Sequence, residues 1–171
     1  KQLGWEEKLQ ARVVVYADDF VILCRDKAEE ARKQMQAIMS KLKLTVNEQK
    51  TRVCRVPEES FDFLGYTLGR CYSPKTGRSF IGTRPSRKRI NAICDKISWM
   101  TQRHSYGEPV ETMVEEMNRT LRGWYGYFQH SAGGVFDGVD GFVRRRLRSL
   151  LEKRRGRTRQ GMGKAHQRWP N

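Results

Sequence analysis

The chain has 171 residues, of which 37% are hydrophobic and 31% charged, and its formal net charge is +15. This length suits one ordinary domain or two small ones, and no apolar run approaches the roughly 18 residues of a membrane span. The four cysteines lie far apart without the spacing of a zinc site, so we expect free thiols in a reducing compartment. The charge indicates a polyanionic partner such as nucleic acid, with an anionic membrane or a merely basic protein as alternatives.

The positive charge is concentrated near the C-terminal end of the sequence. Residues 144–171 hold 11 Lys or Arg and one Glu, a net charge of +10. Residues 1–83 hold 15 Lys or Arg against 11 Asp or Glu, a net charge of only +4. A polyanion is therefore expected to contact mainly the C-terminal part.

Two adjacent carboxylates lie between two apolar runs near the start of the chain. Val13–Tyr16 and Phe20–Leu23 predict two buried strands, with room between them only for a tight turn that carries Asp18 and Asp19. One interpretation is an ordinary exposed turn, because aspartate favours turns. The other is a Mg²⁺ site, because this cation takes carboxylate oxygens. Alternate residues of a strand point to opposite faces, so both carboxylates reach one ion only where the chain bends.

The segment after this hairpin predicts one helix and several short strands. Apolar residues at helical spacing predict an amphipathic helix over residues 27–42. Strands are predicted at Leu44–Val46, Thr51–Val56 and Phe61–Tyr66, and residues 71–81 predict the return strand of a hairpin.

The remaining sequence predicts three amphipathic helices. The first covers residues 87–103, and the second begins at Pro109 and continues through Gly123–Phe128. The third begins at Phe142, after a glycine-rich loop over residues 131–141. Within Gly123–Phe128, four aromatic residues either fill the core between helices or present rings for stacking on bases, and different rings can do each.

Cations occupy the start of the first of these helices and much of the third. Arg87, Lys88 and Arg89 lie at the positive end of the helix dipole, where a bound phosphate would offset their repulsion. In the third helix the apolar residues face inward, which turns the arginines outward as one basic ridge. A solvated charged face is the alternative. The residues predicted to contact nucleic acid are Arg87, Lys88, Arg89, Arg144, Arg145, Arg146, Arg148, Lys153, Arg154 and Arg155.

Three strings, in this order, resemble the group II intron-encoded reverse transcriptases and maturases. Tyr16-Ala17-Asp18-Asp19 between hydrophobic strands is similar to the palm signature of reverse transcriptases. Phe63-Leu64-Gly65 resembles the primer-grip region of the same family. Leu121-Arg122-Gly123-Trp124, followed by Tyr127-Phe128, looks like the thumb, or X domain, of group II intron maturases. The final Trp169-Pro170-Asn171 is also similar to the end of that thumb.

The resemblance implies an α+β fold. It would consist of a partial reverse-transcriptase palm, an antiparallel sheet with a packed helix, followed by an all-α three-helix thumb. Residues 1–83 would be the C-terminal half of the palm with both hairpins, and residues 84–155 the thumb. Residues 156–171 would be a basic flexible tail, because they contain few apolar residues.

The same resemblance implies an RNA-directed DNA polymerase and maturase that binds intron RNA and copies an RNA template by two-metal nucleotidyl transfer. Mg²⁺ would be held by Asp18 first and Asp19 second. Lys50 would lie near the phosphates of the incoming dNTP, although an ordinary surface lysine is the alternative. Phe63, Leu64 and Gly65 would support the DNA primer.

The palm of this family needs a further aspartate on an earlier strand, and the residues before Val13 do not supply it. We therefore expect a piece of a longer protein that binds RNA but does not polymerise by itself. The alternatives are a splicing-only maturase module, or a retron or CRISPR-associated reverse transcriptase. The expected location is a bacterial cytoplasm or an organelle of bacterial descent.

Overall fold

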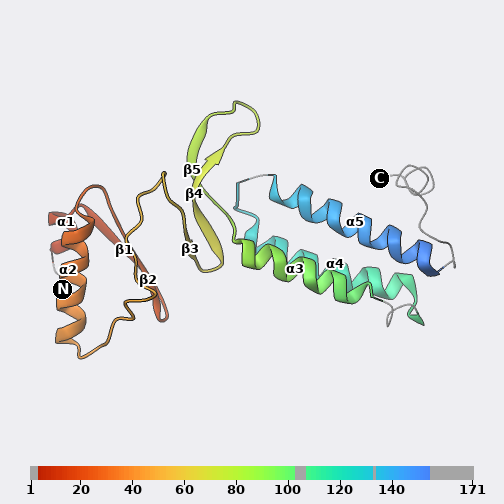
Figure 1. The fold of residues 1–171 in the computed structure, drawn as a ribbon, viewed down its shortest axis with the longest axis horizontal. Coiled ribbons are helices and arrows are strands. Elements are labelled where there is room, and N and C mark those ends of the chain that lie inside the picture. The colour runs from red at the N-terminus through yellow and green to blue at the C-terminus, as the bar shows by residue number, and fades with distance from the viewer. Residues whose placement is uncertain (1–3, 103–106, 133, 155–171) are drawn as a thin grey trace.

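A hairpin with two helices, a three-stranded antiparallel sheet and three further helices follow one another along an elongated molecule (Figure 1). The computed structural model describes residues 4–102, 107–132 and 134–154. The predicted α+β class is confirmed. None of the helices in these ranges combines the length and apolarity needed to cross a bilayer. The four cysteines are all free.

The N-terminal unit is a hairpin packed against helices. Helix α1 (Trp5–Lys8) precedes strands β1 (Ala11–Tyr16) and β2 (Asp19–Cys24), which pair antiparallel, and helix α2 (Ala28–Lys41) follows. The hairpin and the helix predicted over residues 27–42 are therefore confirmed. Helix α2 contacts β2 and buries Ala31 and Met35.

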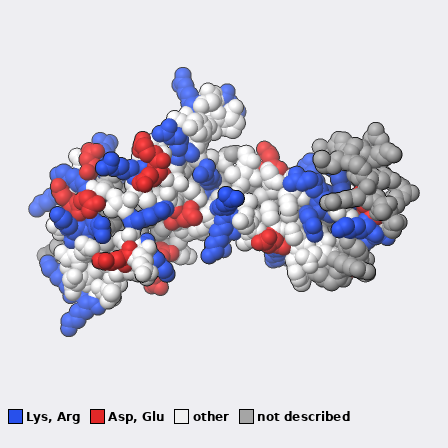
Figure 2. Space-filling model, viewed as in Figure 1, with Lys and Arg blue, Asp and Glu red and all other residues white. Residues whose placement is uncertain are grey.

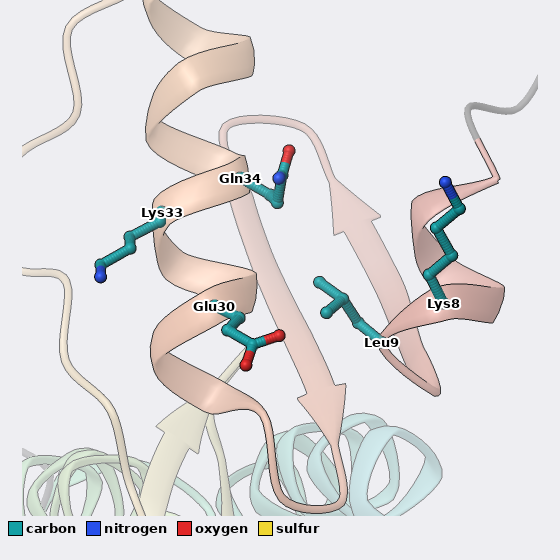
Figure 3. A pocket seen from close by; sticks show the side chains of 5 residues that line it. All are labelled: Lys8, Leu9, Glu30, Lys33 and Gln34. Carbon is teal, nitrogen blue, oxygen red and sulfur yellow. The ribbon is translucent and has the colours of Figure 1, made fainter.

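A hollow of about 200 Å³ lies between α1 and α2 (Figure 3). Leu9 points into it, whereas Lys33 points away from it. Its lining residues are Lys8, Leu9, Glu30, Lys33 and Gln34. Because cations, a carboxylate and an amide mix around one leucine, we interpret the hollow as a packing gap between the two helices.

The prediction that the hairpin strands are buried is wrong. The exposed fractions of Val14, Val15 and Tyr16 are 42%, 65% and 65%. Consecutive strand residues point to opposite faces, so Val14 and Val15 are exposed on both faces of the hairpin near its turn. Helix α2 contacts β2, and no described element covers this end of β1 on either face.

The connection from α2 to the second sheet contains no strand, so the strands predicted at residues 44–46 and 51–56 are wrong. Asn47 instead closes a turn, because its side-chain oxygen accepts hydrogen bonds from the backbone of Gln49 (3.1 Å) and Lys50 (3.3 Å). The alternating pattern of Thr51–Val56 has no partner strand in the described residues, and alternation alone does not make a strand.

The second sheet has the order β3-β4-β5, with β3 (Phe61–Phe63), β4 (Tyr66–Tyr72) and β5 (Ser79–Pro85). The strand predicted over residues 61–66 is interrupted by a two-residue turn. Leu64 and Gly65 have φ values of 51° and 82°, which suit the tight turns that join antiparallel strands. Residues 71–81, predicted as a return strand, instead contain the end of β4, a turn and the start of β5, and β4 and β5 pair as an antiparallel hairpin.

Three helices, α3 (Arg87–Met100), α4 (Val110–Phe128) and α5 (Val135–Arg154), form a bundle at the other end of the molecule (Figure 1). The buried residues of their shared core are Ile93, Ile97, Met100, Met113, Met117, Val139, Val143 and Leu150. These three helices contain the main hydrophobic core of the described chain.

Helix α5 begins at Val135, so the loop predicted over residues 131–141 and the helix start at Phe142 are wrong. Val139 and Val143, one helical turn apart, are both buried in the bundle core. Burying a valine contributes about 1.5–3 kcal/mol, whereas a glycine within a helix costs about 1 kcal/mol. Packing therefore outweighs the low helix propensity of Gly138 and Gly141.

Candidate metal-binding hairpin and nucleic-acid interface

Asp18 and Asp19 lie at the end of the β1–β2 hairpin, and both are exposed. Tyr16 pairs with Asp19, so Ala17 and Asp18 are the two turn residues and Asp19 is the first residue of β2. Ala17 has a φ of 49°, which is uncommon for a residue with a Cβ atom. The chain bends between the strands, which is the condition under which neighbouring carboxylates can serve one cation.

The donor chemistry of this pair fits Mg²⁺, which takes oxygen ligands and keeps several waters or substrate oxygens in its octahedral shell. Among the residues that the structure describes, no three His, Cys, Asp or Glu side chains gather where they could hold a metal ion. Asp18 and Asp19 would therefore supply part of a ligand set. The remaining oxygens would come from water, substrate or other carboxylates.

Lys50 is exposed in the turn that Asn47 closes, and it belongs to no helix or strand. The backbone N–H of Lys50 donates to the Asn47 carbonyl at 3.1 Å. This geometry fixes the backbone and leaves the ammonium group in solvent. A role for Lys50 at the phosphates of a nucleotide stays a prediction.

The Leu64–Gly65 turn is docked on the helical bundle. The hydroxyl of Tyr127, in the last turn of α4, donates a hydrogen bond of 2.8 Å to the Leu64 carbonyl. In return, the hydroxyl of Tyr66 donates to the Tyr127 carbonyl. Their rings are stacked with centroids 5.6 Å apart, and the Tyr66 ring also meets the edge of Phe128 at 4.9 Å. Burial, and secondarily the neighbouring Tyr127, raise the pKa of Tyr66 above its ordinary value.

The same turn contacts the start of α3. The backbone N–H of Ser86 donates to the Gly65 carbonyl at 2.8 Å, and a Cβ atom at Gly65 would lie 2.9 Å from Nε of Arg89. Arg89 shares the first turn of α3 with Arg87 and Lys88, all exposed, and no acidic residue lies in that turn. The structure thus brings together the predicted primer-grip residues and one of the predicted nucleic-acid-binding clusters.

The ring contacts divide the aromatic residues of α4 into two groups. Trp124 packs against the bundle core and contacts Phe128 and Phe136, with centroids 5.1 and 5.8 Å away, and Phe128 is buried. Tyr125 and Tyr127 are 52% and 54% exposed. The core interpretation therefore holds for Trp124 and Phe128, and the two tyrosines carry the exposed rings.

The basic ridge predicted on α5 is wrong for Arg146. Its guanidinium group turns to the end of α3 and donates to the hydroxyl of Thr101 at 2.9 Å and to the carbonyl of Ser98 at 3.0 Å. A cation at this position interacts favourably with the negative end of a helix dipole. Arg146 therefore joins two helices, and sequence reasoning missed this because its partners come from another helix.

Other cations of α5 remain at the surface. Arg144, Arg145 and Lys153 are exposed, and Arg148 and Arg154 are partly buried. Arg144 forms an exposed ion pair with Asp140 at 3.9 Å, which contributes little. On the face seen in Figure 2, Lys and Arg side chains gather over α5. Arg155, predicted with this group, lies outside the described residues, as do residues 156–171.

Two families match successive parts of the chain. Residues 3–68, which contain the Asp18–Asp19 hairpin and the Leu64–Gly65 turn, match the reverse transcriptase (RNA-dependent DNA polymerase) family. Residues 90–169 match the group II intron, maturase-specific domain. The class is thus a reverse transcriptase region followed by a maturase domain. No curated protein matches the sequence. The chain belongs to the group II intron-encoded reverse transcriptases/maturases.

Proposed function

We propose that residues 1–83 are the C-terminal half of a reverse-transcriptase palm, residues 84–155 its thumb, and residues 156–171 a basic tail. The observation that carries this proposal is the position of Asp18 and Asp19 at a hairpin turn inside the segment that matches reverse transcriptases. The three-helix bundle inside the maturase match supports the thumb assignment.

The proposed reaction is nucleotidyl transfer from a dNTP to the 3′-hydroxyl of a primer on an RNA template. Mg²⁺ bound by Asp18 and Asp19 would supply charge stabilisation for the attacking and departing oxygens. Lys50 would donate hydrogen bonds or a proton toward the departing pyrophosphate. Phe63, Leu64 and Gly65 would support the primer, and the turn that they form is held on the bundle by Tyr127.

The exposed cations of α5 support a second function, binding of intron RNA by the bundle. Arg144, Arg145 and Lys153 lie on a helix with few acidic residues and face solvent. A splicing-only maturase would need this surface and not the carboxylate hairpin. Both functions belong to the same family, and one protein can perform both.

Two measurements separate these functions. In a protein that extends a primer on RNA with Mg²⁺ and dNTPs, Asp18→Asn should abolish extension and leave intron RNA affinity unchanged. The 171-residue chain alone should bind intron RNA without extending a primer. Primer extension by this chain alone, abolished by Asp18→Asn, would contradict the expectation that it only binds RNA.

RNA binding should weaken steeply with salt, because phosphate contacts release counterions. Replacing Arg144 and Arg145 together by Ser should lower the slope of log affinity against log salt by about 0.7–0.9 for each lost phosphate contact. An unchanged slope would exclude α5 as the RNA-binding surface.

A further inference from the structure

The β4–β5 hairpin extends beyond its neighbour in the sheet and projects from the molecule (Figure 1). Strand β3 pairs only with Tyr66–Leu68 of β4. The outer four residue pairs, from Gly69–Gly82 to Tyr72–Ser79, therefore form a ribbon of two strands. We call residues 70–81 the hairpin tip.

The hairpin tip carries large apolar side chains in solvent. Tyr72, Ile81 and Phe80 are 63%, 62% and 44% exposed. Tyr72 pairs with Ser79 and Arg70 pairs with Ile81, so Tyr72 and Ile81 lie on one face of the ribbon. A two-stranded hairpin is only marginally stable by itself. Apolar side chains that stay in solvent do not stabilise it, because no apolar surface is removed from water. A partner that covers this face would supply that burial.

The charge of the hairpin identifies the kind of partner. Residues 66–85 contain four Lys or Arg and no Asp or Glu. Arg70 is paired with Glu58 at 3.7 Å, an exposed contact that partly neutralises it. Lys75 and Arg78 lie in the turn region between the strands, and on the face seen in Figure 2 the projecting tip has no acidic side chain. A second copy of the hairpin would bring like charges together, whereas a polyanion would neutralise them.

We propose that the hairpin tip binds single-stranded RNA, separately from the cations of α5. An unpaired base stacks on the Tyr72 ring beside Ile81, and Lys75 and Arg78 pair with the flanking phosphates. Aromatic rings next to cations are the usual means of holding unpaired nucleotides. The inference goes beyond the proposed function, and it rests on that function only in taking RNA as the partner.

The test measures binding of the whole chain to a fluorescein-labelled oligo(U) RNA of about 12 nucleotides, within the range of known single-strand sites. Tyr72→Ala should weaken binding about fivefold or more and leave the salt slope unchanged. Tyr72→Phe should retain the affinity, because the ring remains. Replacing Lys75 and Arg78 together by Ser should lower the salt slope by about 1.4, which is two phosphate contacts to a single strand.

The matched control replaces Lys33 and Lys41, two exposed lysines of α2, by Ser and should leave the salt slope unchanged. Circular dichroism establishes that each variant is folded. If Tyr72→Ala binds oligo(U) as well as the unaltered chain, the proposal is overturned. It is also overturned if Tyr72→Ala changes only the oligomeric state in light scattering, because the tip is then a protein interface. If only the variant with Arg144 and Arg145 replaced by Ser loses oligo(U) binding, the inference about the hairpin tip is rejected. The proposed RNA-binding function of α5 would remain.

Discussion

Tyr66 and Tyr127 form reciprocal hydrogen bonds across the junction between the second sheet and the helical bundle. Each hydroxyl donates to a backbone carbonyl on the other side, Tyr66 to that of Tyr127 and Tyr127 to that of Leu64. The backbone N–H of Ala132 adds a bond of 2.7 Å to the Thr83 carbonyl. The Leu64–Gly65 turn and β5 are thus fixed to the bundle, which sets the orientation of the second sheet relative to the three helices.

Removing these hydroxyl groups should reduce stability in a coupled manner. Tyr127→Phe and Tyr66→Phe each delete one hydrogen bond and retain the stacked ring, so each should lower the free energy of unfolding by about 0.5–1 kcal/mol. Because the two rings are in contact, the double variant should deviate from the sum by about 0.5 kcal/mol or more. Urea unfolding of the four proteins measures this coupling. Strict additivity would show that the two bonds act independently.

Two glycines should respond to alanine in opposite directions. At Gly65 the φ of 82° and the approach of Arg89 Nε to 2.9 Å from a Cβ atom should make Gly65→Ala cost about 1–2 kcal/mol. At Gly126, within α4, a Cβ atom would meet nothing within 4 Å, so Gly126→Ala should stabilise by about 0.5–1 kcal/mol. Thermal unfolding of both variants gives the comparison. Stabilisation by Gly65→Ala would be incompatible with the turn geometry described.

The parts of the fold that the sequence predicts well depend on local signals. The β-branched runs on each side of Asp18 and Asp19 identify the hairpin, because two strands joined by a tight turn need no distant partner. Helix α2 follows from apolar spacing alone. The error at α5 has the opposite cause, since burial of Val139 depends on two other helices and overrides the glycines next to it.

At the candidate site too, contacts between residues far apart in the sequence could not be predicted. No local pattern links Tyr127 with Leu64, which lies 63 residues away. Helix geometry partly predicts that Arg146 points away from Arg144 and Arg148. Each residue turns the helix by about 100°, so Arg146 lies about 200° around the helix from both of them. Its partners at the end of α3 could not be predicted, because they depend on how the helices pack.

Arg146 should therefore behave differently from its neighbours on α5. Arg146→Ser removes hydrogen bonds from a charged donor to Ser98 and Thr101, and it should cost about 1–3 kcal/mol of stability. Replacing the exposed Arg144 and Arg145 by Ser should change stability by no more than about 0.5 kcal/mol and should weaken RNA binding instead. Urea unfolding and RNA titration of both variants test this division. A stability loss from the Arg144 and Arg145 variant equal to that from Arg146→Ser would contradict it.

The raised pKa of Tyr66 should make the stability of the protein depend on pH in the alkaline range. Burial first, and Tyr127 second, raise this pKa above the ordinary value of about 10, so the folded state holds the proton more tightly than the unfolded state. The stabilisation is complete below pH of about 10 and is lost as the pH rises through the folded-state value. The unfolding free energy of the unaltered chain should therefore fall more steeply above that pH than that of Tyr66→Phe. If the unfolding free energies of the two proteins change in parallel from neutral to alkaline pH, Tyr66 has the same pKa in the folded and unfolded states, and the prediction is wrong.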